Sequence, residues 1–197
     1  MKKFELTTES IETASGEKLF RIKALVSFDA VEAGELGGYV EKEENLSHEG
    51  NAWVYGNARV YGNARVYGNA WVYDNTQVYD NTQVYGNAWV YGNAQVYGNA
   101  RVYGNAQVCG DADIYDNSQK SSVDGFGSEN RTTTFFREKS GGVGVKCGCF
   151  YGTLDEFREK VRKTHGDSEI AQEYLAIADV EERRFKRVAK KGDSRCI

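Results

Sequence analysis

The sequence predicts a mainly β protein built around a three-sided parallel β-helix. Residues 51–116 divide into eleven six-residue repeats (hexads) without an insertion, beginning "NAWVYGNARVYG". Gly and Asn, with Asp in a few places, occupy the junctions between hexads, and Trp53, Trp71 and Trp89 recur every 18 residues. A fixed period of this kind is typical of solenoids, in which each repeat buries its apolar side against its neighbours.

Each hexad reads as one short strand followed by one corner. Ala52 and Val54 lie two residues apart, so a strand points both to the same side, and the residue between them points to the other side. Gly and Asn tolerate the left-handed backbone region that a sharp corner needs. We therefore expect Ala and Val inside the solenoid.

The tryptophan spacing indicates three hexads in each coil. With 18 residues per coil, Trp53, Trp71, Trp89 and Gln107 form one column, in steps of about 4.8 Å. The other two columns begin at Arg59 and Arg65. One side of the solenoid would therefore carry the tryptophans, and about four coils would be stacked.

The repeat resembles the hexapeptide repeat of left-handed parallel β-helices. In that family an aliphatic residue begins each hexad and a small residue follows four positions later, as Val54 and Ala58 do here. The resemblance covers about a third of the chain and implies a left-handed coil, an exception to the usual right-handed crossover. Tyrosine departs from the family pattern, because a small or acidic residue is preferred at its position.

The segments on either side of the repeat would cover its open strand edges. Residues 1–50 read as a β-rich N-terminal cap, with a hairpin made by "KFELTT" and "KLFRIKALV". "NLSHEG" reads as a degenerate hexad in which His48 stands where valine belongs. The β-helix itself is assigned to residues 51–122.

Residues 123–131 are polar and rich in Ser and Gly, and they are predicted to form a linker. Residues 132–197 are predicted to form a small α+β unit with two strands, "TTTFFRE" and "VGVKCGCF", and two helices. Thr153 and Glu156 form a capping-box pattern at the start of the first helix, and Gly166 suits its end. "SEIAQEYLAIADVEERRFKRVAKK" is the second, amphipathic helix.

Composition and charge restrict the classes of partner. The formal net charge is −4, and the repeat is nearly neutral, so long nucleic acid is not an expected ligand. No apolar run approaches the roughly 18 residues that cross a bilayer. The four cysteines, Cys109, Cys147, Cys149 and Cys196, favour reduced thiols in a cytoplasm over a disulfide framework. A cytoplasmic protein without membrane attachment is predicted.

Three longer segments resemble phage- and prophage-borne hexapeptide-repeat proteins that are often labelled polymer-forming or transferase-like. They are "LFRIKAL", "GELGGYVEKEENLSHEGNAWVYGNA" and "CGCFYGTLDEFREKVRKTHGD". The resemblance covers nearly the whole chain. It implies a viral or mobile-element origin, hence action in a host-cell cytoplasm, and it supplies no mechanism.

Catalysis and metal binding have weak support. Hexapeptide acyltransferases are trimers that use a histidine base and a loop protruding from the coils, but this repeat has no inserted loop and the chain has only His48 and His165. Cys147, Cys149 and His165 would need a fourth ligand to hold zinc, and a pair of small buried thiols is the simpler interpretation. No catalytic residue, metal ligand or cofactor is predicted.

The aromatic residues of the tryptophan side form the predicted binding face: Trp53, Trp71, Trp89, Tyr55, Tyr73 and Tyr91. Their rings could stack along the coil axis and only stabilise the fold, or dock a partner such as a second copy in a dimer or trimer. The predicted function is a non-catalytic, phage-related binding or scaffold protein that self-associates. The alternatives are an acyltransferase, or an inhibitor of a host defence process that captures a protein or a small nucleotide signal.

Overall fold

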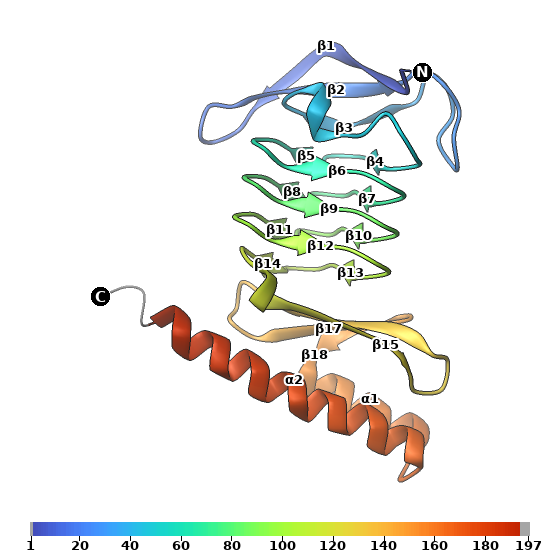
Figure 1. Ribbon diagram of the computed structural model, residues 1–197, viewed down its shortest axis with the longest axis vertical. Helices are drawn as coiled ribbons and strands as arrows, with labels where there is room; N and C mark the ends of the chain where they lie inside the picture. The colour runs from blue at the N-terminus through green and yellow to red at the C-terminus, as the bar shows by residue number, and fades with distance from the viewer. Residues whose placement is uncertain (1, 194–197) are drawn as a thin grey trace. The chain divides into compact units, whose positions relative to one another are not determined.

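The computed structural model describes residues 2–193, which form two compact units that divide between Asp111 and Ala112. Figure 1 shows the first unit as a stack of coils below three N-terminal strands. The second unit contains a small sheet and two helices. No helix within residues 2–193 has the length and apolar character needed to cross a membrane.

The predicted three-sided parallel solenoid is confirmed. Strands one coil apart pair in parallel and in register, as Trp53 with Trp71 and Trp71 with Trp89. The coil strands of the first unit are β4 (Trp53–Val54), β5 (Arg59–Val60), β6 (Arg65–Val66), β7 (Trp71–Val72), β8 (Gln77–Val78), β9 (Gln83–Val84), β10 (Trp89–Val90), β11 (Gln95–Val96), β12 (Arg101–Val102) and β13 (Gln107–Val108). The 18-residue coil follows directly from this register.

The interior of the solenoid is a column of Ala and Val side chains, as predicted. Ala52, Val54, Ala58 and Val60 are each 0 % exposed, and the later coils repeat the pattern. Thr76 and Thr82 take the place of alanine in two hexads and are equally buried. Burial of these side chains in every hexad drives the coils to stack.

The corners depend on residues that accept a positive φ. Gly68 has a φ of 73°, and a side chain there would meet the backbone nitrogen of Gly86 in the next coil at 3.1 Å. Asp74 replaces glycine at one corner with a φ of 62°, and its Oδ2 accepts a hydrogen bond of 3.0 Å from the backbone N–H of Gly92. That bond offsets strain at a non-glycine corner.

The N-terminal cap continues one sheet of the solenoid. Strands β1 (Phe4–Glu12) and β2 (Lys18–Ala24) form the predicted hairpin, and β3 (Leu36–Val40) pairs antiparallel with β2 and parallel with β5. β3 therefore joins the antiparallel cap to the parallel coils. A short 3-10 helix, η1 (Glu43–Asn45), follows it.

The degenerate hexad is offset by two residues from its predicted register. Leu46 forms a parallel bridge with Val66, and Leu46 is 1 % exposed. Leu46, and not His48, therefore fills the valine position of this coil. Val40 already pairs with Val60 in the same shifted register, and Trp53 pairs with Trp71 in the regular one, so the offset arises after η1, between Leu46 and Trp53. Within η1, the buried Asn45 donates through Nδ2 to the carbonyls of Gly62 and Ala64 at 3.2 and 2.8 Å.

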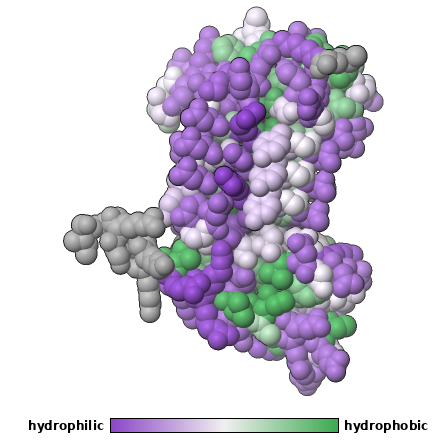
Figure 2. All heavy atoms as spheres, in the orientation of Figure 1, coloured by the Kyte–Doolittle hydropathy of each residue, from purple (hydrophilic) through white to green (hydrophobic). Residues whose placement is uncertain are grey.

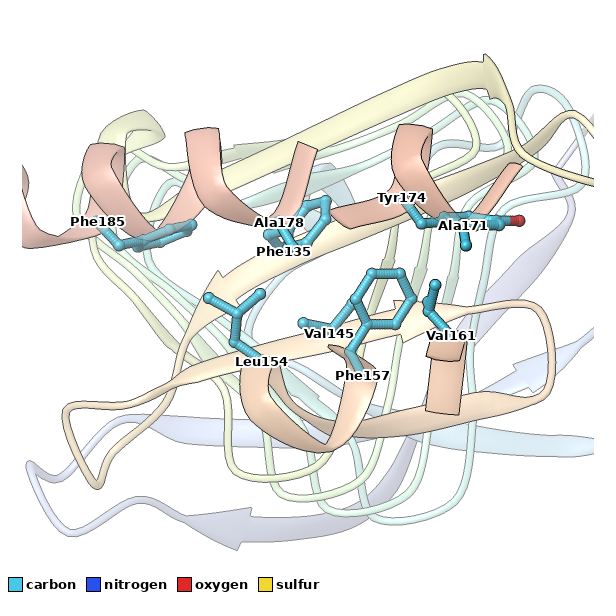
Figure 3. Close-up of a cluster of buried hydrophobic side chains, with 9 residues drawn as sticks. All are labelled: Phe135, Val145, Leu154, Phe157, Val161, Ala171, Tyr174, Ala178 and Phe185. Atoms are coloured by element: carbon cyan, nitrogen blue, oxygen red, sulfur yellow. The ribbon is translucent and has the colours of Figure 1, made fainter. Parts of the chain in front are cut away.

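The second unit is a four-stranded antiparallel meander covered by two helices. Its elements are β14 (Asp113–Ile114), the 3-10 helix η2 (Asn117–Gln119), β15 (Lys120–Phe126), β16 (Arg131–Arg137), β17 (Val143–Cys147), β18 (Phe150–Thr153), α1 (Leu154–His165) and α2 (Glu169–Asp193). The sheet order is β15-β16-β17-β18. Figure 3 shows the shared core of Phe135, Val145, Leu154, Phe157, Val161, Ala171, Tyr174, Ala178 and Phe185.

The expectation of a linker at 123–131 is not met. β15 extends to Phe126 and pairs with β16, with Val123 opposite Thr133 and Phe126 opposite Arg131. The ladder has a register shift between Val123 and Phe126, so this polar segment forms an irregular hairpin strand that depends on its partner β16. The predicted capping box is confirmed, since Glu156 Oε2 accepts from the Thr153 N–H at 2.7 Å and Thr153 Oγ1 accepts from the Glu156 N–H at 3.3 Å.

Candidate binding groove

The tryptophan column is in register but its three side chains have different surroundings. Trp53 is 0 % exposed, Trp71 is half-buried and Trp89 is 44 % exposed. Trp53 lies edge-on to Phe28 and Phe4 of the cap, with ring centroids 5.4 and 6.4 Å apart. Trp53, which the sequence places in the predicted binding face, is therefore buried, because the cap covers the first coil.

The tyrosine columns stack along the coil axis, and the tryptophan column does not. Tyr73 and Tyr91 stack at 4.9 Å with their planes 1° apart, and Tyr67 and Tyr85 stack at 4.9 Å and 2°. No stacked pair joins the three tryptophans within residues 2–193, and Trp71 has no ring partner there. Stacking along the coil axis thus gives these tyrosines a structural role. It gives no such role to the exposed indoles.

A groove with a volume of about 540 Å³ runs along the tryptophan side. It is lined by Asp29, Ala30, Tyr55, Asn69, Trp71, Tyr73, Asn87 and Trp89. Tyr55 is 43 % exposed and, unlike the tyrosines that begin the other two columns, has no stacked neighbour among the described residues. Volume and aromatic lining both match those of ligand sites in proteins.

The hexad places an amide on one edge of this groove and a phenol on the other. Asn stands two residues before each tryptophan and Tyr two residues after it, so each coil presents Asn, Trp and Tyr across one side. Asn69 Nδ2 donates to Asn87 Oδ1 at 3.1 Å, and Asn87 Nδ2 donates to Asn105 Oδ1 at 3.1 Å. The amides are thereby held in fixed orientations.

The groove carries little charge. None of its eight lining residues is Lys, Arg or His, and Asp29 is the one carboxylate among them. Burial, followed by the nearby Asp74 carboxylate, raises the pKa of Tyr73 to about 12, so its phenol remains protonated at neutral pH. Figure 2 draws another face of the coil stack, the one that carries β6, β9 and β12 in Figure 1, where a pale column of intermediate hydropathy lies beside hydrophilic strips.

His48 has a structural environment. Its ring stacks on Phe4 at 4.4 Å, and Nδ1 accepts a hydrogen bond from the Lys3 N–H at 3.2 Å. Nε2 lies 3.4 Å from Glu43 Oε2, and Lys2 Nζ pairs with the other oxygen of Glu43 at 2.6 Å. Both ring nitrogens are engaged, so the ring fixes the N-terminal strand against the first coil.

The cysteines of the second unit do not lie as predicted. Cys147 ends β17, Cys149 lies in the turn before β18, and Gly148 between them has a φ of 53°, so the two thiols do not share one strand face. Cys149 is exposed and Cys147 is half-buried, which overturns the expectation of two buried thiols. Residues 2–193 contain no cluster of three metal-ligating side chains, and Cys196 lies outside them.

Sequence reasoning identified four aromatic lining residues, Trp71, Trp89, Tyr55 and Tyr73, and missed the polar ones. The hexad pattern predicts Asn69 and Asn87 only as corner residues, although their spacing from the tryptophans places them on the same side. Asp29 comes from the cap and carries no sequence signal, apart from its unusual φ of 46° in the structure. Tyr91 does not line the groove, because it stacks beneath Tyr73.

A comparison with protein families supports the solenoid. The family described as YdcK Beta solenoid repeat matches residues 52–68, 58–74, 64–80 and 94–110. All four matches lie inside the coil region, so the similarity concerns the repeat and not the cap or the second unit. No curated protein matches the chain. Together, the coils and the family match identify this chain as a β-solenoid protein.

Proposed function

We propose that this β-solenoid is a non-catalytic binding protein that holds its partner in the groove on the tryptophan side. One observation carries the proposal. Trp71 and Tyr55 present ring faces that no other ring of residues 2–193 covers, while the tyrosines in the other columns are stacked. Aromatic rings exposed in a concave site are a common feature of docking surfaces.

The solenoid suits such a site because it is rigid. Backbone hydrogen bonds join consecutive coils on the tryptophan side, as from the Trp71 N–H to the Ala88 carbonyl at 2.9 Å and from the Tyr73 N–H to the Val90 carbonyl at 3.0 Å. The backbone that carries the groove side chains therefore needs little rearrangement when a ligand binds. A preorganised surface therefore binds with a smaller entropic cost.

Self-association is a second form that this binding could take. Trp89 and Tyr55 are 44 % and 43 % exposed, and a symmetric dimer or trimer would cover them. A second copy and a separate ligand would compete for the same rings. The proposal thus predicts that oligomer formation, where it occurs, depends on Trp71 and Trp89.

The alternative functions have less support from the geometry. An acyltransferase would need a free base, and both nitrogens of His48 already have partners. A small nucleotide signal would bring phosphate charges to a groove that no cationic side chain lines. Capture of a host protein by a phage-related chain remains compatible with the groove, and it belongs to the proposed class of binding protein.

A comparison of three immobilised proteins tests the proposal. The wild type, the Trp71→Ala/Trp89→Ala variant and the Gln77→Ala/Gln95→Ala variant, altered on the next side of the same coils, are exposed to extract of the producing cells. We expect the wild type and the glutamine variant to retain the same component and the tryptophan variant to lose it. Equal retention by all three proteins would exclude the groove as the binding face.

A further inference from the structure

We propose that the groove binds a neutral oligosaccharide. This inference rests on the proposed function and names the chemical class of its ligand. A pyranose ring has apolar C–H faces and a rim of hydroxyl groups that both donate and accept hydrogen bonds. The groove has complementary parts, namely uncovered aromatic faces and polar side chains with unused hydrogen-bonding capacity along their border.

The charge of the groove selects against anionic ligands. Its eight lining residues include one carboxylate, Asp29, and no cationic side chain. A phosphate or carboxylate ligand would gain no ion pair there and would be repelled by Asp29. A ligand that carries hydroxyl groups without formal charge avoids this penalty and can donate a hydrogen bond to the Asp29 carboxylate.

The aromatic surface is extended along the coil axis. Trp71 and Trp89 lie in adjacent coils, in steps of about 4.8 Å, and Tyr55 and Tyr73 flank them. An extended platform suits a chain of linked rings better than one small cation, which needs several rings around a single point. Tyr73 is stacked on Tyr91 on one side and meets Trp89 edge-on at 6.3 Å, which fixes its orientation.

The side-chain amides of Asn69 and Asn87, on one edge of the groove, can still donate and accept hydrogen bonds. A side-chain amide has two N–H groups and an oxygen with two lone pairs. Asn87 accepts one bond from Asn69 and donates one to Asn105, which leaves one N–H and one lone pair for a ligand. A donor and an acceptor side by side can bridge two adjacent hydroxyl groups of a sugar.

Asp29 adds an acceptor at the cap end of the groove. Its side chain is exposed and forms no ion pair or hydrogen bond within the part of the chain that the structure describes. The three polar side chains that border the rings, Asp29, Asn69 and Asn87, therefore all have capacity to bind hydroxyl groups. This combination favours a sugar over a purely apolar peptide side chain.

The probes are cellotetraose, maltotetraose, mannotetraose, xylotetraose and the tetramer of N-acetylglucosamine, titrated at millimolar concentration into the full-length protein. Binding is followed by isothermal calorimetry and by indole fluorescence. At least one neutral tetramer is expected to bind, and a tetramer of galacturonate is expected to bind about tenfold more weakly or not at all, because of Asp29.

Matched variants connect the binding to the groove. Trp71→Ala is expected to weaken binding by about tenfold or more, through loss of the ring face. Asn87→Ala should weaken binding, whereas Asn81→Ala, which removes the same ladder bond at another corner, should not. Thermal unfolding of each variant identifies any loss that is due to unfolding alone.

Three outcomes would overturn the inference. They are failure of every neutral tetramer to bind, binding that Trp71→Ala leaves unchanged, and preference for the galacturonate tetramer. If the sugars fail while the tryptophan variant still loses its partner from extract or its oligomeric mass, the ligand class is wrong and the proposed binding function stands. If neither response depends on Trp71, both proposals fail.

Discussion

Phe28 lies edge-on against Trp53 at a centroid distance of 5.4 Å, and this contact removes the first indole from solvent. Trp71 and Trp89, one and two coils further on, line the groove instead. Of the three identical residues in this column, one is thus part of the core and the other two lie at the surface. The sequence period makes the three positions equivalent, and the cap makes them different.

Alanine substitutions along the column should separate these roles. Trp53→Ala is expected to lower the free energy of unfolding of the first unit by about 3–5 kcal/mol, because it leaves a large cavity under the cap. Trp89→Ala is expected to lower it by only about 1–2 kcal/mol, because a 44 % exposed side chain buries only part of its surface and leaves no enclosed cavity. Urea denaturation measures both, and equal losses would contradict the assignment.

Thr82 is a buried polar residue whose replacement should stabilise the coils. Its Oγ1 has no hydrogen-bond partner in residues 2–193, whereas Thr76 Oγ1 donates to the Tyr73 carbonyl at 2.8 Å. Thr82→Val is expected to raise the free energy of unfolding by about 1 kcal/mol, and Thr76→Val should gain less, because it breaks a bond of similar worth. A larger gain from Thr76→Val, measured by denaturant titration, would refute this reasoning.

Alkaline pH should unfold the solenoid through its tyrosines. Burial is the main cause that raises the pKa of both Tyr61 and Tyr73 from 10.0 to about 12. Because the folded state binds these protons more tightly, its stabilisation is complete below pH 10 and is lost as the pH rises through 12. Circular dichroism and phenolate absorbance against pH should therefore change together, and tyrosine ionisation near pH 10 without unfolding would contradict the burial.

We expect His48 to stabilise the fold. His48→Ala removes the ring stacked on Phe4 at 4.4 Å and the acceptor of the Lys3 N–H, and it should lower the free energy of unfolding by about 1–2 kcal/mol. Glu44→Ala, in the adjoining η1 segment, is the control and should have little effect. An unchanged free energy of unfolding in His48→Ala would contradict this structural role and would favour a chemical role for the ring.

The coils could be predicted from sequence because every hexad repeats the same local chemistry. Val54 and Ala52 define the interior, Gly68 and its equivalents define corners, and the spacing of Trp53 and Trp71 gives the number of sides. Each of these inferences needs only residues within one or two coils. Left-handedness, implied by the resemblance, stays a prediction.

The groove could be predicted only in part because its boundary depends on contacts distant in sequence. Phe28 covers Trp53 and Asp29 borders the groove, yet both belong to an irregular cap segment without periodicity. The two-residue offset at Leu46 is removed only in the irregular segment between Leu46 and Trp53, where the sequence departs from the hexad pattern. Gly148 likewise turns an apparent single strand into a hairpin that separates Cys147 from Cys149.

Fluorine resonances of protein labelled with fluorotryptophan test the central claim most directly, because the three indoles can be assigned by single substitutions. When the partner retained from extract or a binding tetramer is added, the account predicts that the Trp71 and Trp89 signals shift and that the Trp53 signal, shielded by Phe28, does not. Binding that leaves Trp71 and Trp89 unshifted, or that shifts Trp53 as much, would contradict the account.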